Sequence, residues 1–188
     1  QRINDVLVKK VRKQAGRHER PSAAVIDSQS VKTSEGGEER GVDVHKQTPG
    51  RKRHLVVDVL GLVLLVVVHS ASIQDGAGGL LTLQKLFDHI KHNLHNRWCR
   101  LKLIWADGGY PSIMDVVRQR FGWTLQIVKR SDDVKGFQVL PHRWVVERTF
   151  GWLGRYRRLA RDYEHTTLSS ESMVYIASSR RMLRLLAT

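Results

Sequence analysis

Three carboxylates stand at positions where a side chain could do chemistry rather than only meet solvent. Asp27 ends the apolar stretch AVID, and Asp107 ends the apolar stretch LIWAD. Glu147 lies within WVVERTFGWL, among tryptophan, valine, phenylalanine and leucine. A carboxylate is costly to bury unless a cation pairs with it. Three carboxylates that converge can do so around cations, and oxygen ligands suit Mg²⁺ or Mn²⁺.

Such a cluster would indicate chemistry at phosphorus. Two divalent ions about 3.5–4 Å apart activate an attacking oxygen and steady a leaving oxygen. In a basic protein, the substrate of that chemistry is expected to be a phosphodiester. The sequence therefore favours an enzyme that cuts or joins nucleic acid strands.

Each carboxylate also has an ordinary structural interpretation. Asp27 could be a capping or turn residue, and Asp107 precedes Gly-Gly, a common turn. Glu147 could pair with Arg143, four residues before it on a helix. The combination of all three favours the functional interpretation.

The elements that must position these carboxylates follow from hydrophobic periodicity. One strand is expected within 20–30, ending near Asp27, and two strands are expected to form a hairpin over 54–70. Two further strands are expected at 101–107 and 123–130. Helices are expected near the N-terminus and over 83–94, 113–121, 142–159 and 170–187, with connections at 31–53, 74–79 and 131–141.

This order predicts an α/β fold with a five-stranded mixed sheet, an antiparallel hairpin plus parallel strands, flanked by helices. Ligands in such sheets collect at the carboxyl ends of strands. Asp27 and Asp107 both end strands, so we expect them to meet at one edge of the sheet.

The charge balance points to a polyanionic partner. The chain of 188 residues carries 32 Lys and Arg against 18 Asp and Glu, a net charge of +14, which makes nucleic acid the expected partner. GRKRH (50–54) groups Arg51, Lys52 and Arg53, either as a solvated basic loop or as phosphate contacts. Lys32 and Lys46 are similar candidates for DNA contacts.

Cysteine content and hydropathy bear on the compartment. Cys99 is the only cysteine, so neither an intrachain disulfide nor a cysteine-based zinc site is expected. The apolar stretch 55–68 has fourteen residues, including Asp58, and is too short to cross a membrane. We expect a cytoplasmic, nucleoid-associated protein of a bacterium, with no membrane partner.

Four segments carry a resemblance to a known family. IDSQSVKT (26–33), GRKRHLVVDVLGLVL (50–64), ADGGY (106–110) and HRWVVERTFGWLGRYRRLARDYE (142–164) resemble the catalytic part of IS5-family insertion-sequence transposases. The resemblance runs from about residue 20 to 187. It implies an RNase H-like fold and a DDE site in which Asp27, Asp107 and Glu147 are the catalytic residues and hold Mg²⁺ or Mn²⁺, two ions in all.

The resemblance also implies how DNA would be held. Arg143 matches an arginine that related transposases carry four residues before the last carboxylate. Gly154 stands where those transposases carry a lysine, so Arg155 or Arg158 is a candidate for that role. The implied partners are the terminal inverted repeats of the element and target DNA, bound by a homodimer or larger assembly.

Two domain segments are expected. Residues 1–19 form a basic N-terminal helix, the remnant of or link to a missing N-terminal DNA-recognition region, and residues 20–188 form the catalytic domain. Two other functions remain open: a non-catalytic, DNA-binding transposase remnant, and a general RNase H-like nuclease.

Overall fold

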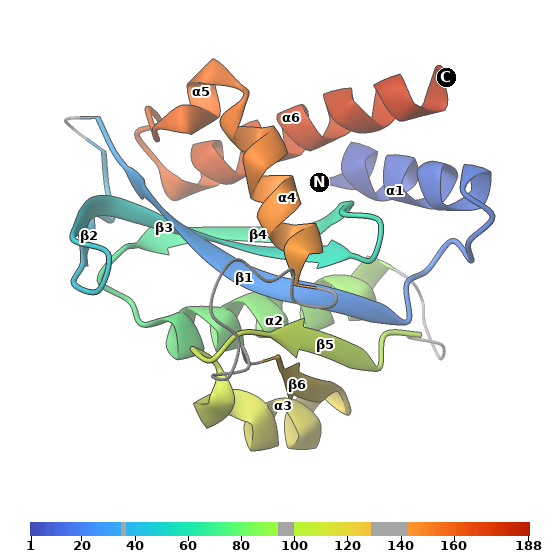
Figure 1. Ribbon diagram of the computed structural model, residues 1–188, viewed down its shortest axis with the longest axis horizontal. Coiled ribbons are helices and arrows are strands. Elements are labelled where there is room, and N and C mark those ends of the chain that lie inside the picture. Colours follow the sequence, from blue (N-terminus) through green and yellow to red (C-terminus); the bar gives the residue numbers. More distant parts are fainter. Residues whose placement is uncertain (35–36, 94–99, 129–142) are drawn as a thin grey trace, which may run out of the picture.

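A mixed sheet separates two layers of helices (Figure 1). The computed structural model describes residues 1–34, 37–93, 100–128 and 143–188. The sheet has six strands: β1 (Ala23–Lys32), β2 (Gly41–Asp43), β3 (Thr48–Asp58), β4 (Val63–Ser70), β5 (Leu103–Ala106) and β6 (Thr124–Ile127).

The strand order gives the fold its type. β3 pairs antiparallel with β1 on one side and with β2 and β4 on the other. β5 lies parallel to β1, and β6 lies parallel to β5. An antiparallel meander that continues into parallel strands beside β1 is the RNase H-like arrangement, so the expected fold class is confirmed. The sheet has one strand more than expected, because the short β2 pairs with the start of β3.

Two cores lie on opposite faces of the sheet. One face packs against α2 (Asp75–Asn93), the 3₁₀ turn η1 (Pro111–Ile113) and α3 (Met114–Phe121). The other face is covered by α1 (Arg2–Gln14), α4 (Trp144–Gly154), α5 (Arg157–Ala160) and α6 (Thr167–Leu186) (Figure 1). Alternation along the strands separates the cores: Ala24 and Ile26 face α2, whereas Val25 faces α4.

Helix α1 is packed on this second face. Leu7, Val8 and Val11 contact Leu62 and Met182, which lie after β3 and in α6. This contact places α1 alongside α6 (Figure 1).

A buried ion pair joins α1 to the hairpin turn. Arg12 of α1 pairs with Asp58 at the end of β3. The other oxygen of Asp58 accepts hydrogen bonds from the backbone amides of Leu60 and Leu62, at 3.0 and 2.9 Å. The β3–β4 turn is therefore fixed by the N-terminal helix as well as by its own backbone.

The expected connection over 31–53 is wrong for much of its length. β1 continues to Lys32, and β3 begins at Thr48, so GRKRH is part of a strand and not a loop. Polar side chains can occupy a buried strand when other groups satisfy them, and periodicity does not reveal such partners.

The expected loop at 74–79 is also wrong, because α2 begins at Asp75. Gly78 and Gly79 suggested a loop, yet a Cβ atom at Gly78 would overlap His69 and one at Gly79 would overlap the ring of Tyr110. These glycines allow close approach of helix and neighbouring residues rather than a turn.

The remaining expected elements are confirmed with shifted ends. The helix expected over 142–159 is two helices, α4 and α5, with the break after Gly154. Cys99 and the connection expected over 131–141 lie outside the described residues. Within the described ranges, no helix has the length and apolar character needed to span a bilayer.

Candidate active site

Two neighbouring parallel strands bring Asp27 and Asp107 together. The register of β1 and β5 pairs Val25 with Trp105. Continued by two residues, the same register sets Asp27 opposite Asp107, just past the end of β5. Side chains two residues apart share a face, so both aspartates point to the α4 side of the sheet, as Val25 does.

The start of α4 supplies the other charged groups. Arg143 directly precedes the helix, and Glu147 lies in its first turn. The nitrogen Nη2 of Arg143 is 3.9 Å from Asp27 Oδ2, 3.9 Å from Asp107 Oδ2 and 3.4 Å from Glu147 Oε1. One guanidinium nitrogen thus lies within ion-pair distance of all three carboxylates. The ion pair between Glu147 and Arg143 exists, but it is one part of a larger convergence.

Each aspartate is anchored through one oxygen and leaves the other for the shared centre. Asp27 Oδ1 accepts a hydrogen bond from the backbone amide of Ser28 at 2.7 Å. Asp107 Oδ1 accepts one from the amide of Gly109 at 2.8 Å. Both Oδ2 atoms face Arg143, so the backbone fixes the direction in which the free oxygens point.

Helix α4 is held against the β3–β4 turn by stacked cations and aromatic rings. The guanidinium of Arg148 lies 4.2 Å from the ring centre of Trp144 and 4.4 Å from that of Trp152. Arg181 of α6 covers Trp152 at 3.4 Å and reaches the carbonyl of Gly61 at 3.4 Å. This stack is expected to fix the position from which Glu147 projects.

The three carboxylates differ in exposure. The side chains of Asp27, Asp107 and Glu147 are 14%, 32% and 54% exposed. Glu147 therefore lies on the open side of α4, although its sequence neighbours are apolar. Burial, added to by the charge of Asp107, raises the pKa of Asp27 to about 6.

The donor set fits a hard divalent cation. Carboxylate oxygens are the ligands of Mg²⁺ and Mn²⁺, and a cation would favour the charged form of Asp27. In the described part of the chain, no three His, Cys, Asp or Glu side chains are spaced to hold one metal ion as they stand. Arg143 lies between the carboxylates, so metal binding would require its guanidinium to move aside.

The other candidate DNA contacts are scattered over the surface. Lys46 is exposed, and its charge reaches Asp27. Lys32 is exposed at the end of β1, and Arg155 is exposed just past α4. Arg158 belongs to α5 and pairs with Glu164 at 2.8 Å. Arg158 and Glu147 do not share the single helix expected over 142–159, because α4 ends between them.

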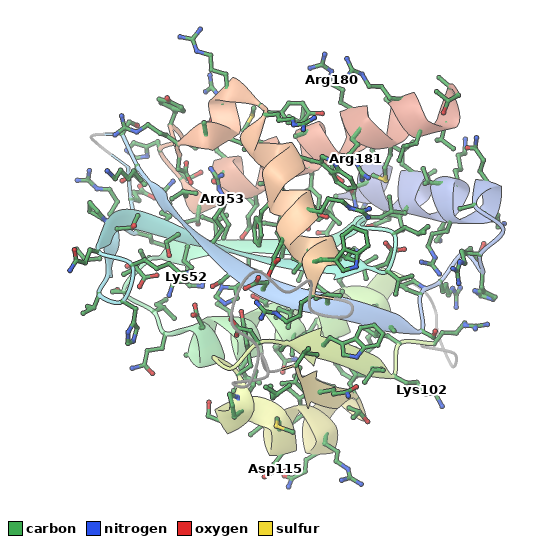
Figure 2. The ribbon with its side chains drawn as sticks, viewed as in Figure 1. Lys52, Arg53, Lys102, Asp115, Arg180 and Arg181 are labelled. Atoms are coloured by element: carbon green, nitrogen blue, oxygen red, sulfur yellow. The ribbon has the colours of Figure 1, made fainter. Side chains whose placement is uncertain are left out.

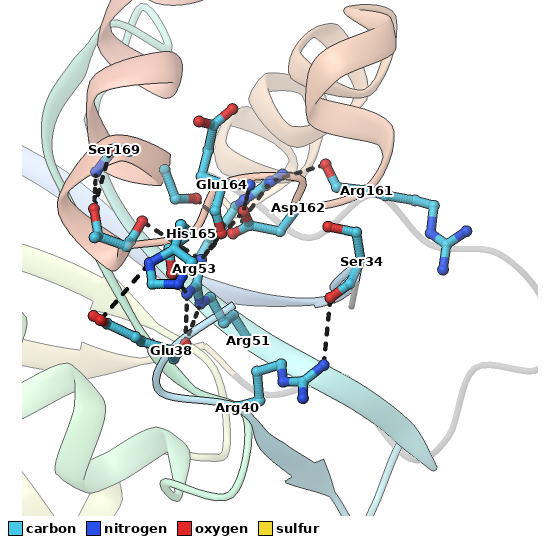
Figure 3. Close-up of polar contacts among 12 residues, drawn as sticks. Ser34, Glu38, Arg40, Arg51, Arg53, Arg161, Asp162, Glu164, His165 and Ser169 are labelled. Carbon is cyan, nitrogen blue, oxygen red and sulfur yellow. Dashed lines mark hydrogen bonds and ion pairs between the residues drawn. The ribbon is translucent and has the colours of Figure 1, made fainter. Parts of the chain in front are cut away.

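The placement of Arg51 and Arg53 at DNA is contradicted by their burial, since their side chains are 0% and 3% exposed. Arg51 donates to the carbonyls of Glu164 and His165 at 2.8 and 2.6 Å (Figure 3). Arg53 donates to the carbonyl of Leu159 at 2.7 Å. These arginines bind the chain segment that joins α5 to α6, so they are structural.

Lys52 points to the opposite face and is likewise buried. Its Nζ donates to the carbonyl of Ile73 at 3.0 Å and pairs with Asp75 at 3.0 Å and Asp43 at 3.4 Å. Its assignment as a DNA contact is therefore also wrong. Asp75, which the sequence did not single out, lies beside the site because α2 starts there. The sequence feature that could have indicated Asp75 is an aspartate shortly after an apolar strand. The glycines around it predicted a loop instead.

Comparison with known proteins gives a family. The family model described as "Transposase DDE domain" matches residues 18–178. A Burkholderia cepacia protein named as a transposase for insertion sequence element IS402 is 34% identical over 118 residues. That alignment covers 62% of this chain and 54% of the relative, so the chain spans about half the length of the curated relative it matches.

Solved structures of low sequence identity also align. The Mos1 mariner paired-end complex with Mn is 9% identical with a TM-score of 0.45, over 98% of this chain and 59% of that one. A pre-cleavage Mos1 transpososome is 9% identical with a TM-score of 0.39, over 98% of this chain and 61% of that one.

Proposed function

The chain belongs to the transposase DDE domain family, and from this premise we propose that it is the catalytic domain of a DNA transposase, with Asp27, Asp107 and Glu147 as its catalytic carboxylates. The observation that carries the proposal is the convergence of all three carboxylates on one nitrogen of Arg143. Three acids around one cation leave an excess of negative charge, which divalent cations would neutralise.

Asp27 and Asp107 would hold Mg²⁺ or Mn²⁺ through the oxygens that now face Arg143, and Glu147 would complete a second position. Bound divalent cations, two in all, would supply Lewis acidity at the phosphate and lower the pKa of the attacking oxygen. Arg143, released from the carboxylates, is placed to pair with a phosphate of the substrate strand.

Two displacements at phosphorus would follow. Water attacks the phosphorus at the end of the element, the bond to the 3′ oxygen breaks, and that oxygen leaves as a 3′-OH. The 3′-OH then attacks a phosphodiester of target DNA, forming one new phosphodiester and releasing a 3′-OH from the target. Both steps are in-line displacements and can use the same carboxylates.

The proposed substrate is double-stranded DNA, comprising the terminal inverted repeats of the element and the target. The net charge of +14 supports a polyanionic partner. Exposed Lys32, Lys46 and Arg155 remain the proposed backbone contacts. Joining two ends implies a dimer or larger assembly on DNA.

Strand cleavage and joining on labelled duplex DNA with Mg²⁺ or Mn²⁺ tests the proposal. Glu147→Gln should lower the rate by roughly 10³-fold, since metal stabilisation of the transition state is worth several kcal/mol. DNA affinity should stay within about twofold, because a carboxylate is not a phosphate contact. Glu38→Gln is the matched control, because Glu38 has a 61% exposed side chain that pairs with His165 and belongs to no part of the carboxylate site.

The outcomes separate the candidate functions. Unchanged cleavage by Glu147→Gln would remove Glu147 from the active site. DNA binding without cleavage by the native chain would favour the non-catalytic remnant. Equal cleavage of unrelated duplexes, with no strand joining, would favour a general nuclease.

A further inference from the structure

A fourth carboxylate lies at the edge of this site. Asp75 is the first residue of α2, and its side chain is 31% exposed. Its Oδ1 accepts a hydrogen bond from the hydroxyl of Ser28 at 2.8 Å and lies 3.0 Å from Lys52 Nζ. Ser28 follows Asp27 directly, so Asp75 is tied to the strand that carries the first catalytic carboxylate.

The second oxygen of Asp75 faces Asp107 across Gly109. A Cβ atom on Gly109 would lie 3.1 Å from Asp107 Oδ1 and 3.5 Å from Asp75 Oδ2. One oxygen of each carboxylate therefore lies close to Gly109. No residue in the described ranges donates a hydrogen bond to Asp75 Oδ2.

The charge of Asp75 is held on the protein in spite of its partial burial. Burial acts to raise the pKa of Asp75, but the hydrogen bonds from Lys52 and Ser28 outweigh it, and the pKa lies below its usual value. Both of these hydrogen bonds go to Oδ1, so Oδ2 is the oxygen of Asp75 that is left toward Gly109.

A buried hydroxyl points to a polar ligand in the same space. Tyr110 is 0% exposed, and no described residue makes a hydrogen bond of normal length and angle to its hydroxyl, although the Ser28 side chain lies near enough to act on its pKa. Burial is the main cause that raises the pKa of Tyr110 well above the usual value, and the negative charges of Asp27, Asp75 and Asp107 add to it. A buried donor without a partner is costly, and an ordered water or the hydration shell of an ion would satisfy it.

We propose that Asp75 is a fourth carboxylate of the active site, whose Oδ2 joins Asp107 in holding a hydrated divalent cation beside Gly109, just past the end of β5. Mg²⁺ is typically held by one or two carboxylates while keeping several waters, which fits two oxygens and an adjoining hydroxyl. Lys52 and Ser28 are positioning residues, because they fix Oδ1 and leave Oδ2 toward Asp107. The inference rests on the proposed function, since it extends the same metal site.

The ordinary alternative is that Asp75 only starts α2 and pairs with Lys52. A carboxylate in the first turn of a helix is stabilising there. In that case, neutralising Asp75 would change the stability of the protein and leave its metal affinity as it was. The two interpretations differ in metal binding, which can be measured without DNA or turnover.

Mn²⁺ binding to the full chain, followed by electron paramagnetic resonance of the free ion, is the deciding experiment. Asp75→Asn should weaken binding of one Mn²⁺ by about 10–100-fold, the range seen when residues that support a metal site are removed. Asp75→Glu should restore part of the affinity. Asp115→Asn is the control, because Asp115 is exposed on the outer side of α3 and points away from the sheet (Figure 2).

Ser28→Ala guards against a variant that fails to fold, because it removes only one hydrogen bond to Asp75. It should weaken Mn²⁺ binding by a few-fold, and native affinity in Ser28→Ala together with native affinity in Asp75→Asn would overturn the inference. If Asp27→Asn and Glu147→Gln lose Mn²⁺ while Asp75→Asn keeps it, the role of Asp75 is wrong and the proposed active site stands. If none of these variants weakens Mn²⁺ binding, the proposed function fails as well.

Discussion

Two charged clusters lie on the same face of the sheet and are satisfied in opposite ways. In the carboxylate cluster, formed by Asp27, Asp107 and Glu147 around Arg143, three acids share one arginine at 3.4–3.9 Å. In the arginine cluster, Arg51 and Arg53 share the single carboxylate of Asp162 at 3.4 and 3.8 Å. The carboxylate cluster has two negative charges in excess, and the arginine cluster has one positive charge in excess.

Other groups of the protein satisfy the excess charge of the arginine cluster but not that of the carboxylate cluster. The arginine cluster is fully buried, and backbone carbonyls of Leu159, Glu164 and His165 accept from its guanidinium groups (Figure 3). Ser170 also donates to Asp162 at 2.6 Å. The carboxylate cluster is open to solvent, and within the described ranges each of its aspartates accepts one backbone hydrogen bond, from Ser28 or Gly109. A charged cluster whose groups are all paired within the protein has a structural role. A charged cluster that is exposed and incompletely paired is suited to binding an external ion or phosphate.

Asp162→Asn should give the largest change in stability. It removes the carboxylate that pairs with both buried guanidinium groups, and breaking such a pair costs about 3–5 kcal/mol of unfolding free energy. Urea denaturation at pH 7 measures the loss, with Asp115→Asn expected within about 0.5 kcal/mol of native. A loss under about 1 kcal/mol would show that the carbonyls alone hold the two arginines.

Asp27→Asn should act with the opposite sign. The pKa of Asp27 is about 6 when folded, above its ordinary value of 3.8, so the folded state resists its ionisation. At pH 7 the variant should be more stable than native by on the order of 1–3 kcal/mol. Thermal and urea unfolding of both proteins, without divalent ions, provide the test.

The pH dependence of that difference follows from linkage. As pH falls from 7 through about 6, native Asp27 takes up its proton in the folded state before it does so unfolded. Native protein therefore gains stability relative to Asp27→Asn, and the gap closes toward pH 3.8. A gap that widens on acidification would contradict the assignment.

A buried histidine pair should show the reverse pH dependence. Burial, with the charge of His69 adding to it, lowers the pKa of His54 to about 3, and the two rings are joined at 2.9 Å. The unfolded chain takes up this proton near pH 6.5, so unfolding free energy should fall by about 1 kcal/mol or more as pH drops from 6.5 toward 4. His54→Asn should reduce the slope, measured as urea midpoints across that range.

Lys46→Ala should give the smallest effect and tests which lysines reach DNA. Lys46 is exposed beside Asp27, whereas Lys102 is exposed at the start of β5, at the far end of the strand (Figure 2). If Lys46 contacts a phosphate, its loss should reduce the slope of log affinity against log salt by about 0.9. Lys102→Ala should leave the slope unchanged. If both variants change the slope equally, the DNA does not bind preferentially beside Asp27.

A residue's role could be predicted from the sequence when its hydrogen-bond and ion-pair partners followed from local patterns, and not when those partners lie far along the chain. Asp27 and Asp107 could be expected to meet, because each follows apolar residues of a strand and the two strands are parallel neighbours, although β1 continues past Asp27 to Lys32. Residues 50–54 could not be placed, because Arg51 and Lys52 are satisfied by carbonyls and acids far along the chain. Gly78 and Gly79 predict a loop when only the sequence is considered. In the structure they lie in α2, and their lack of a Cβ atom allows close contact with His69 and Tyr110.

By itself, the sequence determined the order of strands and helices, the hairpin at 54–70 and the residue types from which an acidic site could be built. These follow from hydrophobic alternation and local propensity, which a chain carries in its own order. Tertiary structure decided which charges are scaffold and which are open. Arg53 and Arg143 look alike in the sequence, yet one is closed in by backbone carbonyls and the other lies among three carboxylates. Burial and partner geometry exist only once distant segments meet, so the role of a charge is settled by the fold.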